Sequence, residues 1–163
     1  AGADAIVCTV QNTPVLLAFA DCVPVILVAP GGFAVAHSGW KGTIARISAY
    51  TTEALCQATG VKPSEVKAYI GPHIGSADYE VSSELIQMFS QEFGPNVVDR
   101  ASGEKYLDLG YAVRAALIDA GVRESAIEEV TDSTASTTAR FFSYRAEHGK
   151  CGRHAAVAYM AAK

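Results

Sequence analysis

A cysteine, a histidine and a cationic turn are the residues of this sequence best suited to chemistry. Cys22 opens the apolar run CVPVILVA, and His37 closes the following run FAVAH. The turn Pro30-Gly31-Gly32 separates the two runs, a pattern typical of a β-hairpin. Because the first residue of one strand and the last residue of its antiparallel partner meet at the same end, Cys22 and His37 are predicted to lie close together.

A thiol beside an imidazole has three common explanations. The imidazole can raise the thiolate fraction, so that the cysteine becomes a nucleophile. The two groups can also bind Zn²⁺ together. Finally, both can be packed residues, since free cysteine is among the most buried residue types. The pair by itself leaves all three explanations open.

The residues around the pair favour a functional site. Ser38-Gly39-Trp40-Lys41-Gly42 follows His37 directly and forms a glycine-punctuated turn that leads into a predicted helix. Backbone N–H groups at a helix start attract anions, and Lys41 adds a positive charge there. Asp21 precedes the cysteine. The sequence therefore predicts a metal or nucleophile, a carboxylate and an anion-binding turn at one rim.

Size and composition bound the class of protein. With 163 residues, half of them apolar, the chain fits one domain with a sizeable core. The net charge of -4 argues against a nucleic-acid surface, and no uncharged apolar run is long enough to span a membrane. Four cysteines without a CxxC pair favour reduced thiols and a cytoplasmic protein. The composition gives no oligomeric state.

The pattern of apolar residues predicts an α+β fold, with mixed β-sheets packed against about three helices. Strands are predicted at 5–10, 14–19, 22–29, 33–37, 66–70, 127–130 and 154–162, and a further hairpin at 96–99 and 105–109. The first four strands are continuously apolar and are expected to be covered on both faces. Helices are predicted over 43–58, from Ser82 or Ser83 to Phe93, and over 111–120. The second helix is expected to bury Leu85, Ile86, Met88, Phe89 and Phe93.

Several motifs together resemble one known family. ADCVPVILVAPGGFAVAHSGWKGT at 20–43 resembles the ADCxPVLL…HAGWRG hallmark of the laccase-domain family, also called multicopper polyphenol oxidase-like. IGPHIGSADYEV, LDL, RFFSYR and GKCGR follow in the family's order, so the resemblance covers almost the whole chain. It implies a single laccase-like domain over 1–163, lacking an N-terminal segment of the family. The implied fold is similar to that of cytotoxic-necrotizing-factor-like cysteine hydrolases.

The resemblance also implies a ligand set. Members of the family bind Zn²⁺ through one cysteine and two histidines, and Cys22 and His37 match two of these positions. The other histidine is expected in the N-terminal segment, and His73 is the candidate within this chain. Lys41 stands where the family commonly has arginine, and it cannot offer phosphate the bidentate fork of a guanidinium.

The implied activity is purine nucleoside phosphorolysis. Adenosine, inosine, guanosine or methylthioadenosine would react with phosphate to give the base and ribose 1-phosphate, with adenosine deamination as a side activity. In this hypothesis Cys22 and His37 hold the zinc, Lys41 steers phosphate, and Trp40 stacks on the base. His73, Tyr79 and Glu80 are further candidates for contacts to the substrate, and a buried structural role is an equal alternative for Glu80.

Three alternatives come from other classes of protein. The family's older name implies a copper polyphenol oxidase, although four histidines are few for several copper ions. A metal-free hydrolase would use Cys22 and His37 as nucleophile and base. A non-catalytic accessory factor in cell-wall maintenance is the third. For Arg140, Arg145 and Arg153, the expected structural role is surface pairing or docking against Glu128-Glu129.

Overall fold

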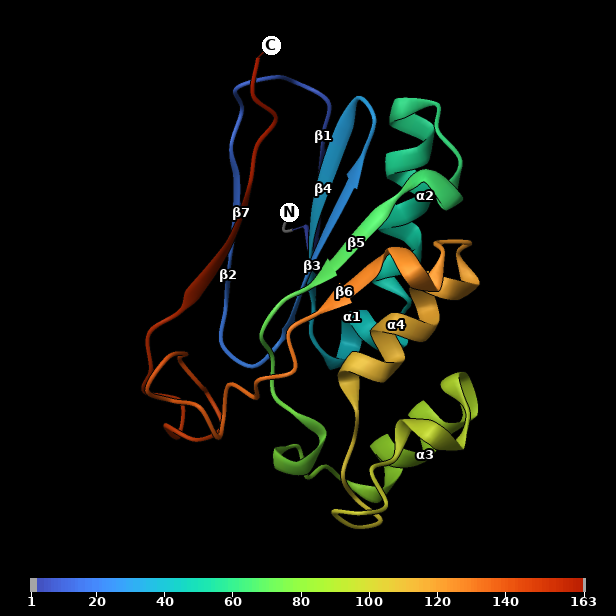
Figure 1. The fold of residues 1–163 in the computed structure, drawn as a ribbon. Coiled ribbons are helices and arrows are strands. Elements are labelled where there is room, and N and C mark those ends of the chain that lie inside the picture. Colours follow the sequence, from blue (N-terminus) through green and yellow to red (C-terminus); the bar gives the residue numbers. More distant parts are fainter. Residues whose placement is uncertain (1–2, 163) are drawn as a thin grey trace.

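The central element is a five-stranded sheet, seen in a computed structural model that describes residues 3–162. Its strand order is β1-β4-β3-β5-β6, and β5 and β6 run parallel whereas the other neighbours are antiparallel (Figure 1). The strands are β1 (Ala5–Cys8), β3 (Val23–Ala29), β4 (Gly32–Ser38), β5 (Lys67–Ile70) and β6 (Ile127–Glu129). This arrangement confirms the predicted mixed α+β fold.

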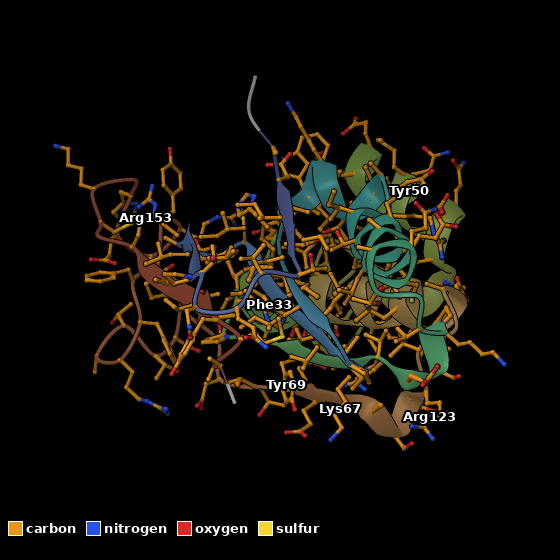
Figure 2. The ribbon with its side chains drawn as sticks, turned by 90° about the horizontal axis from the view of Figure 1, so that it is seen from above. Phe33, Tyr50, Lys67, Tyr69, Arg123 and Arg153 are labelled. Carbon is orange, nitrogen blue, oxygen red and sulfur yellow. The ribbon has the colours of Figure 1, made fainter. Side chains whose placement is uncertain are left out.

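Two different layers cover the sheet. On one face lies an antiparallel ribbon of β2 (Val15–Phe19) and β7 (His154–Ala158) (Figure 1). On the other face lie helices, of which α2 and α4 pack on the strands and α3 packs on α4. The helices are α1 (Trp40–Ile44), α2 (Ile47–Thr59), α3 (Ser83–Phe93) and α4 (Leu109–Asp119). Figure 2 shows Phe33 between the sheet and the ribbon, while Tyr50 lies on the outside of the helical layer.

The β3–β4 hairpin is confirmed, and its register sets the site. Val23 pairs with Ser38 and Pro24 pairs with His37, so Cys22 lies immediately beyond the last pair. The alternate residues Val23, Val25 and Leu27 are fully buried under the helices, and Ile26 packs toward the ribbon. Both faces of β3 are therefore covered, as its continuous apolarity predicts.

The first predicted helix is wrong in one respect, because the chain forms two helices where one was expected. Arg46 separates α1 from α2 with a left-handed φ of 57°, a conformation that interrupts a right-handed helix. Its guanidinium pairs with Glu92 at 2.8 Å and Asp119 at 2.5 Å and stacks on Phe93. Contacts to α3 and α4 thus stabilise a break that local propensity does not reveal.

Three smaller expectations also differ from the structure. The predicted hairpin at 96–99 and 105–109 is reduced, within the described residues, to a 3-10 turn at Pro95–Val97 and the bridge between Val98 and Leu107. Met88 is 45% exposed, because α3 turns Phe89 and Phe93 toward the core. The outer face of β2 is open, with Leu16 60% exposed.

Among residues 3–162, we find no helix with both the length and the apolar character needed to cross a membrane.

Candidate active site

The open end of the β3–β4 hairpin borders a pocket of about 290 Å³. Cys22 reaches it from the start of β3 and His37 from the end of β4, while the turn into α1 closes it from a third side. Its lining consists of Asp4, Cys22, His37, Gly39, Trp40, Lys41 and Gly42. The predicted proximity of Cys22 and His37 is therefore confirmed, and four of the seven predicted site residues share this pocket.

Gly39 keeps the space between the thiol and the imidazole open. A Cβ atom on Gly39 would lie 3.0 Å from Cys22 Sγ and 3.6 Å from His37 Cε1. The backbone of Gly39 has a φ of -75°, so any residue could adopt its conformation. A side chain here would therefore crowd the pocket, whereas the turn itself would accept one. The sequence shows a glycine here but gives no sign of this role.

His37 is held by the segment before β1. Its N–H donates to the Asp4 carbonyl at 2.7 Å, and its Nδ1 lies 3.7 Å from Asp4 Oδ1. The ring also packs against Phe19, with centroids 5.4 Å apart. These contacts fix the backbone and the ring of His37 at the pocket.

Cys22 lies in a setting that favours a neutral thiol in the absence of a cation. Burial raises the pKa of the Cys22 thiol, and the charges of Asp21 and Asp4 raise it further, whereas Arg153 opposes them. Reactive cysteines usually have the opposite environment, in which nearby cations lower the thiol pKa. Carboxylates beside a thiol and an imidazole therefore suit the binding of a cation better than a free thiolate.

Asp21 ties three segments of the chain to Cys22. Its carboxylate accepts hydrogen bonds from Thr134 Oγ1 and from the Arg145 backbone N–H, both at 2.7 Å. Its carbonyl accepts from the N–H of Ile74 at 3.1 Å. Asp21 is only 9% exposed and has a left-handed φ of 79°. The sequence predicts a carboxylate near the cysteine, but not that it fastens distant loops.

Trp40 and Lys41 form the cationic wall of the pocket. Trp40 is 39% exposed, and Lys41 Nζ lies 5.4 Å from the centroid of its ring. Because α1 has only 5 residues, its dipole contributes little to anion binding. The charge of Lys41 is thus the main attraction for an anion on this wall. Trp40 offers an accessible aromatic face beside it.

Tyr79 and Glu80 lie outside the residues that line this pocket. Tyr79 is half-buried beneath the Arg145 guanidinium, 5.2 Å from the ring centroid, and burial raises the pKa of its phenol. Glu80 is exposed; its backbone forms a bridge with Tyr106, and its carbonyl accepts from Arg145 Nη1 at 3.0 Å. The alternative of a buried structural carboxylate at Glu80 is therefore wrong.

His73 lies in a different pocket. It is 6% exposed, its Nδ1 is 2.9 Å from the Gly71 carbonyl, and its Nε2 is 3.9 Å from Glu129 Oε1. Glu129 also accepts from Arg114 Nη2 at 2.7 Å. This pocket of about 250 Å³ is lined by His73, Gly75, Ser76, Asp108, Glu129, Thr131 and Asp132. The structure thus separates His73 from the Cys22–His37 pocket.

Of the two roles expected for the terminal arginines, surface pairing is confirmed for Arg140, whereas docking on Glu128-Glu129 is not observed. Arg140 pairs with Asp132 at 2.8 Å, and Arg145 contacts Tyr79 and Glu80 as described above. Arg153 donates to the Cys151 and Gly152 carbonyls. Glu129 is paired instead with Arg114, because β6 lies beside α4 and not beside the terminal loop.

The Cys22–His37 pair fits part of a zinc site. Thiolate and imidazole are donors that Zn²⁺ prefers, and the space kept open by Gly39 separates them. Within residues 3–162, however, no three His, Cys, Asp or Glu side chains are grouped so that they could hold a metal ion. Catalytic zinc usually has three protein ligands. The described residues therefore supply two suitable donors and an incomplete set.

Comparison with known proteins places this chain among longer relatives. The purine nucleoside phosphorylase of Deinococcus radiodurans is 36% identical over 157 residues, which cover 94% of this chain and 60% of that protein. Adenosine deaminase RL5, from an unknown prokaryotic organism, is 35% identical over 150 residues, which cover 88% of this chain and 57% of that protein. The chain thus spans about three fifths of the length of these relatives.

Solved structures share the fold. YlmD from Geobacillus stearothermophilus superposes with a TM-score of 0.90 at 32% identity, over 99% of this chain and 62% of that chain. YfiH from Bacillus licheniformis gives a TM-score of 0.89 at 31% identity, over 96% and 61%. The family described as multi-copper polyphenol oxidoreductase laccase matches residues 1–161. The resemblance seen in the motifs is confirmed, and the chain belongs to this laccase-like family.

Proposed function

We propose that the Cys22–His37 pocket catalyses the phosphorolysis of purine nucleosides. The observation that carries the proposal is the convergence of a thiol, an imidazole, a lysine and an exposed tryptophan on one pocket of about 290 Å³. Relatives named purine nucleoside phosphorylase support the substrate class. Adenosine, inosine, guanosine and methylthioadenosine are the proposed nucleosides.

The residues of the pocket suit the two halves of such a substrate. The accessible face of Trp40 would stack on the purine base, while Lys41 would attract the phosphate. An oxygen of phosphate forms the bond to C1′ as the bond from C1′ to the base nitrogen breaks. The base leaves with the bonding electron pair and takes up the proton of the phosphate. Holding both reactants in line is the main contribution of the pocket.

We further propose that Cys22 and His37 are two protein ligands of a Zn²⁺ ion. The nearby carboxylates of Asp21 and Asp4 suit a cation, and the space beside Gly39 lies between the two donors. A bound zinc ion supplies Lewis acidity and lowers the pKa of a water that it binds. The remaining ligand would come from polypeptide outside residues 3–162.

Adenosine deamination is the second candidate function. It is favoured by the relative named adenosine deaminase RL5, which is 35% identical. Deamination and phosphorolysis differ in the bond that breaks, because deamination replaces the exocyclic amino group of adenine and leaves the glycosidic bond intact. Both would use the same base-binding surface at Trp40.

The remaining alternatives gain less support from the pocket. Several copper ions need several groups of histidines, whereas the described residues gather one histidine with Cys22, and His73 lies in a separate pocket. A metal-free hydrolase would need an activated thiolate, whereas the surroundings of Cys22 raise its thiol pKa. Within residues 3–162, we find no feature that specifically supports an accessory role in cell-wall maintenance.

The products formed from adenosine distinguish these functions. Adenosine is incubated with the protein in the presence and absence of phosphate, and the products are separated by chromatography. Adenine and ribose 1-phosphate that appear only with phosphate support phosphorolysis. Inosine and ammonia formed without phosphate support deamination instead. If neither set of products forms, while a copper-loaded sample oxidises a phenolic substrate, the proposal is wrong.

A further inference from the structure

Arg145 is held unusually firmly for an exposed arginine. Its backbone N–H is fixed to the buried carboxylate of Asp21 at 2.7 Å. Its guanidinium lies over the Tyr79 ring, and Nη1 donates to the Glu80 carbonyl at 3.0 Å. Tyr79 itself is anchored, because its carbonyl accepts the N–H of Leu107 at 3.0 Å. Backbone, ring and carbonyl contacts together orient this side chain in advance.

No carboxylate of residues 3–162 forms an ion pair with Arg145. Arg46, Arg114 and Arg140 each pair with at least one carboxylate, at 2.5 to 2.8 Å. The contacts of Arg145 are instead to a carbonyl oxygen and an aromatic face, which leave its positive charge uncompensated. A guanidinium that is positioned but has no carboxylate partner is prepared to bind an anion from solution.

The position of Arg145 links it to the candidate active site. Asp21, which fixes its backbone, is the residue before Cys22, and Tyr79 is close enough for the charge on Cys22 to raise the pKa of the phenol. Lys41 lines the pocket from helix α1, whereas Arg145, on the loop before β7, is linked to Cys22 through Asp21 and Tyr79. Arg153, at the end of the same loop, lies on the ribbon side of the molecule in Figure 2, and its charge also acts on the Cys22 thiol.

We infer that Arg145 is the residue that binds the phosphate co-substrate in a bidentate manner. This inference rests on the proposed phosphorolysis. It places the phosphate-binding subsite at a residue outside the cationic wall formed by Trp40 and Lys41. Lys41 is a point charge that attracts phosphate without orienting it, whereas the planar guanidinium of Arg145 matches two phosphate oxygens. The stacking on Tyr79 and the bond to Glu80 fix the direction of the fork.

The test compares phosphate dependence in three variants. Arg145→Gln removes the charge and the fork, and Arg145→Lys keeps the charge only. Arg140→Gln is the matched control, because Arg140 lies in the same loop and is also stacked, at 5.1 Å over Phe141, but pairs with Asp132. The Michaelis constants for phosphate and for the nucleoside are measured separately, and the binding of inorganic phosphate alone is followed by titration calorimetry.

We expect Arg145→Gln to raise the Michaelis constant for phosphate about tenfold to a hundredfold, as expected for lost charged hydrogen bonds. The nucleoside constant should change less than about twofold, and Arg145→Lys should fall between wild type and Gln. Arg140→Gln should match wild type. The inference is overturned if Arg145→Gln leaves the phosphate constant unchanged or alters both constants equally.

Calorimetry separates this inference from the proposed function. If the wild type binds phosphate and Arg145→Gln does not, the subsite stands even when no nucleoside is cleaved. If nucleoside is cleaved but phosphate binding does not depend on Arg145, the proposed function stands and the subsite is wrong.

Discussion

Two histidine–carboxylate pairs of similar distance have different surroundings in this protein. His37 Nδ1 lies 3.7 Å from Asp4 Oδ1, and His73 Nε2 lies 3.9 Å from Glu129 Oε1. The His37 side chain is 35% exposed and lines a pocket with a cysteine, whereas the His73 side chain is 8% exposed. Glu129 also pairs with Arg114, and Asp4 is 71% exposed.

The comparison shows that a pair distance by itself does not identify a site. At His73 the nearby Glu129 carboxylate is neutralised by Arg114. This ion pair links β6 to α4. At His37 the ring has an accessible pocket, a thiol across Gly39 and a weakly held carboxylate. We therefore propose catalytic chemistry for the first pair and stabilisation for the second.

The largest expected contrast is between His37→Ala and His73→Ala. His37→Ala should lower nucleoside turnover by roughly a hundredfold or more while its free energy of unfolding stays within about 1 kcal/mol of wild type. His73→Ala should lose about 2–3 kcal/mol of stability, because it opens a buried space and leaves Glu129 with fewer partners. Turnover per folded molecule should remain. Urea denaturation measures the stability of each variant, and initial rates measure its turnover. Lost turnover in His73→Ala together with lost stability in His37→Ala would contradict the roles proposed for the two pairs.

A smaller effect is expected when the space between Cys22 and His37 is filled. Gly39→Ala places a methyl group 3.0 Å from Cys22 Sγ and displaces the thiol by a few tenths of an ångström. Because the φ of -75° suits alanine, stability should change by less than about 1 kcal/mol. Turnover should fall about tenfold or more, since small displacements of reacting groups are costly. Unchanged turnover would show that this space is not used.

The smallest effect concerns the acidic surroundings of His73. Burial and the charge of Glu129 raise the pKa of Asp108 above its ordinary 3.8, so the folded state binds this proton more tightly than the unfolded chain. The contribution of Asp108 to the free energy of unfolding is therefore fully present below pH 3.8. It is lost as the pH rises through the raised pKa of the folded state.

Asp108→Asn removes this titration and keeps a side chain able to cap α4. Its stability relative to wild type should increase with pH between acidic and neutral conditions. Denaturation curves at several pH values measure the difference. If the free energy of unfolding of the variant minus that of wild type stays constant or falls toward neutral pH, ionisation of Asp108 does not destabilise the folded state.

Local sequence signals predicted the elements near the site well. Pro30-Gly31-Gly32 between two apolar runs was sufficient to place the β3–β4 hairpin, and strand pairing then brought Cys22 beside His37. The break at Arg46 could not be predicted, because the ion pairs that stabilise it are with Glu92 and Asp119 on other helices. The exposure of Met88 likewise depends on how α3 is oriented by its neighbours.

Long-range contacts explain what the sequence missed in the site. His73 was a candidate as a histidine in a glycine-rich loop, but only the fold places it beside Glu129, which in turn pairs with Arg114. Asp21 and Arg145 are 124 positions apart, and no periodicity links them. Gly39 looked like an ordinary turn glycine, although a Cβ atom there would crowd the Cys22 thiol and contact the His37 ring.

The measurement that tests the central claim most directly is nucleoside turnover in Cys22→Ser beside Cys56→Ser. Both cysteines are half-buried, and burial raises the thiol pKa of each, but only Cys22 lines the His37 pocket. We predict that Cys22→Ser loses phosphate-dependent release of adenine from adenosine and that Cys56→Ser keeps it. Retained turnover in a folded Cys22→Ser protein would contradict the assignment of this pocket as the active site.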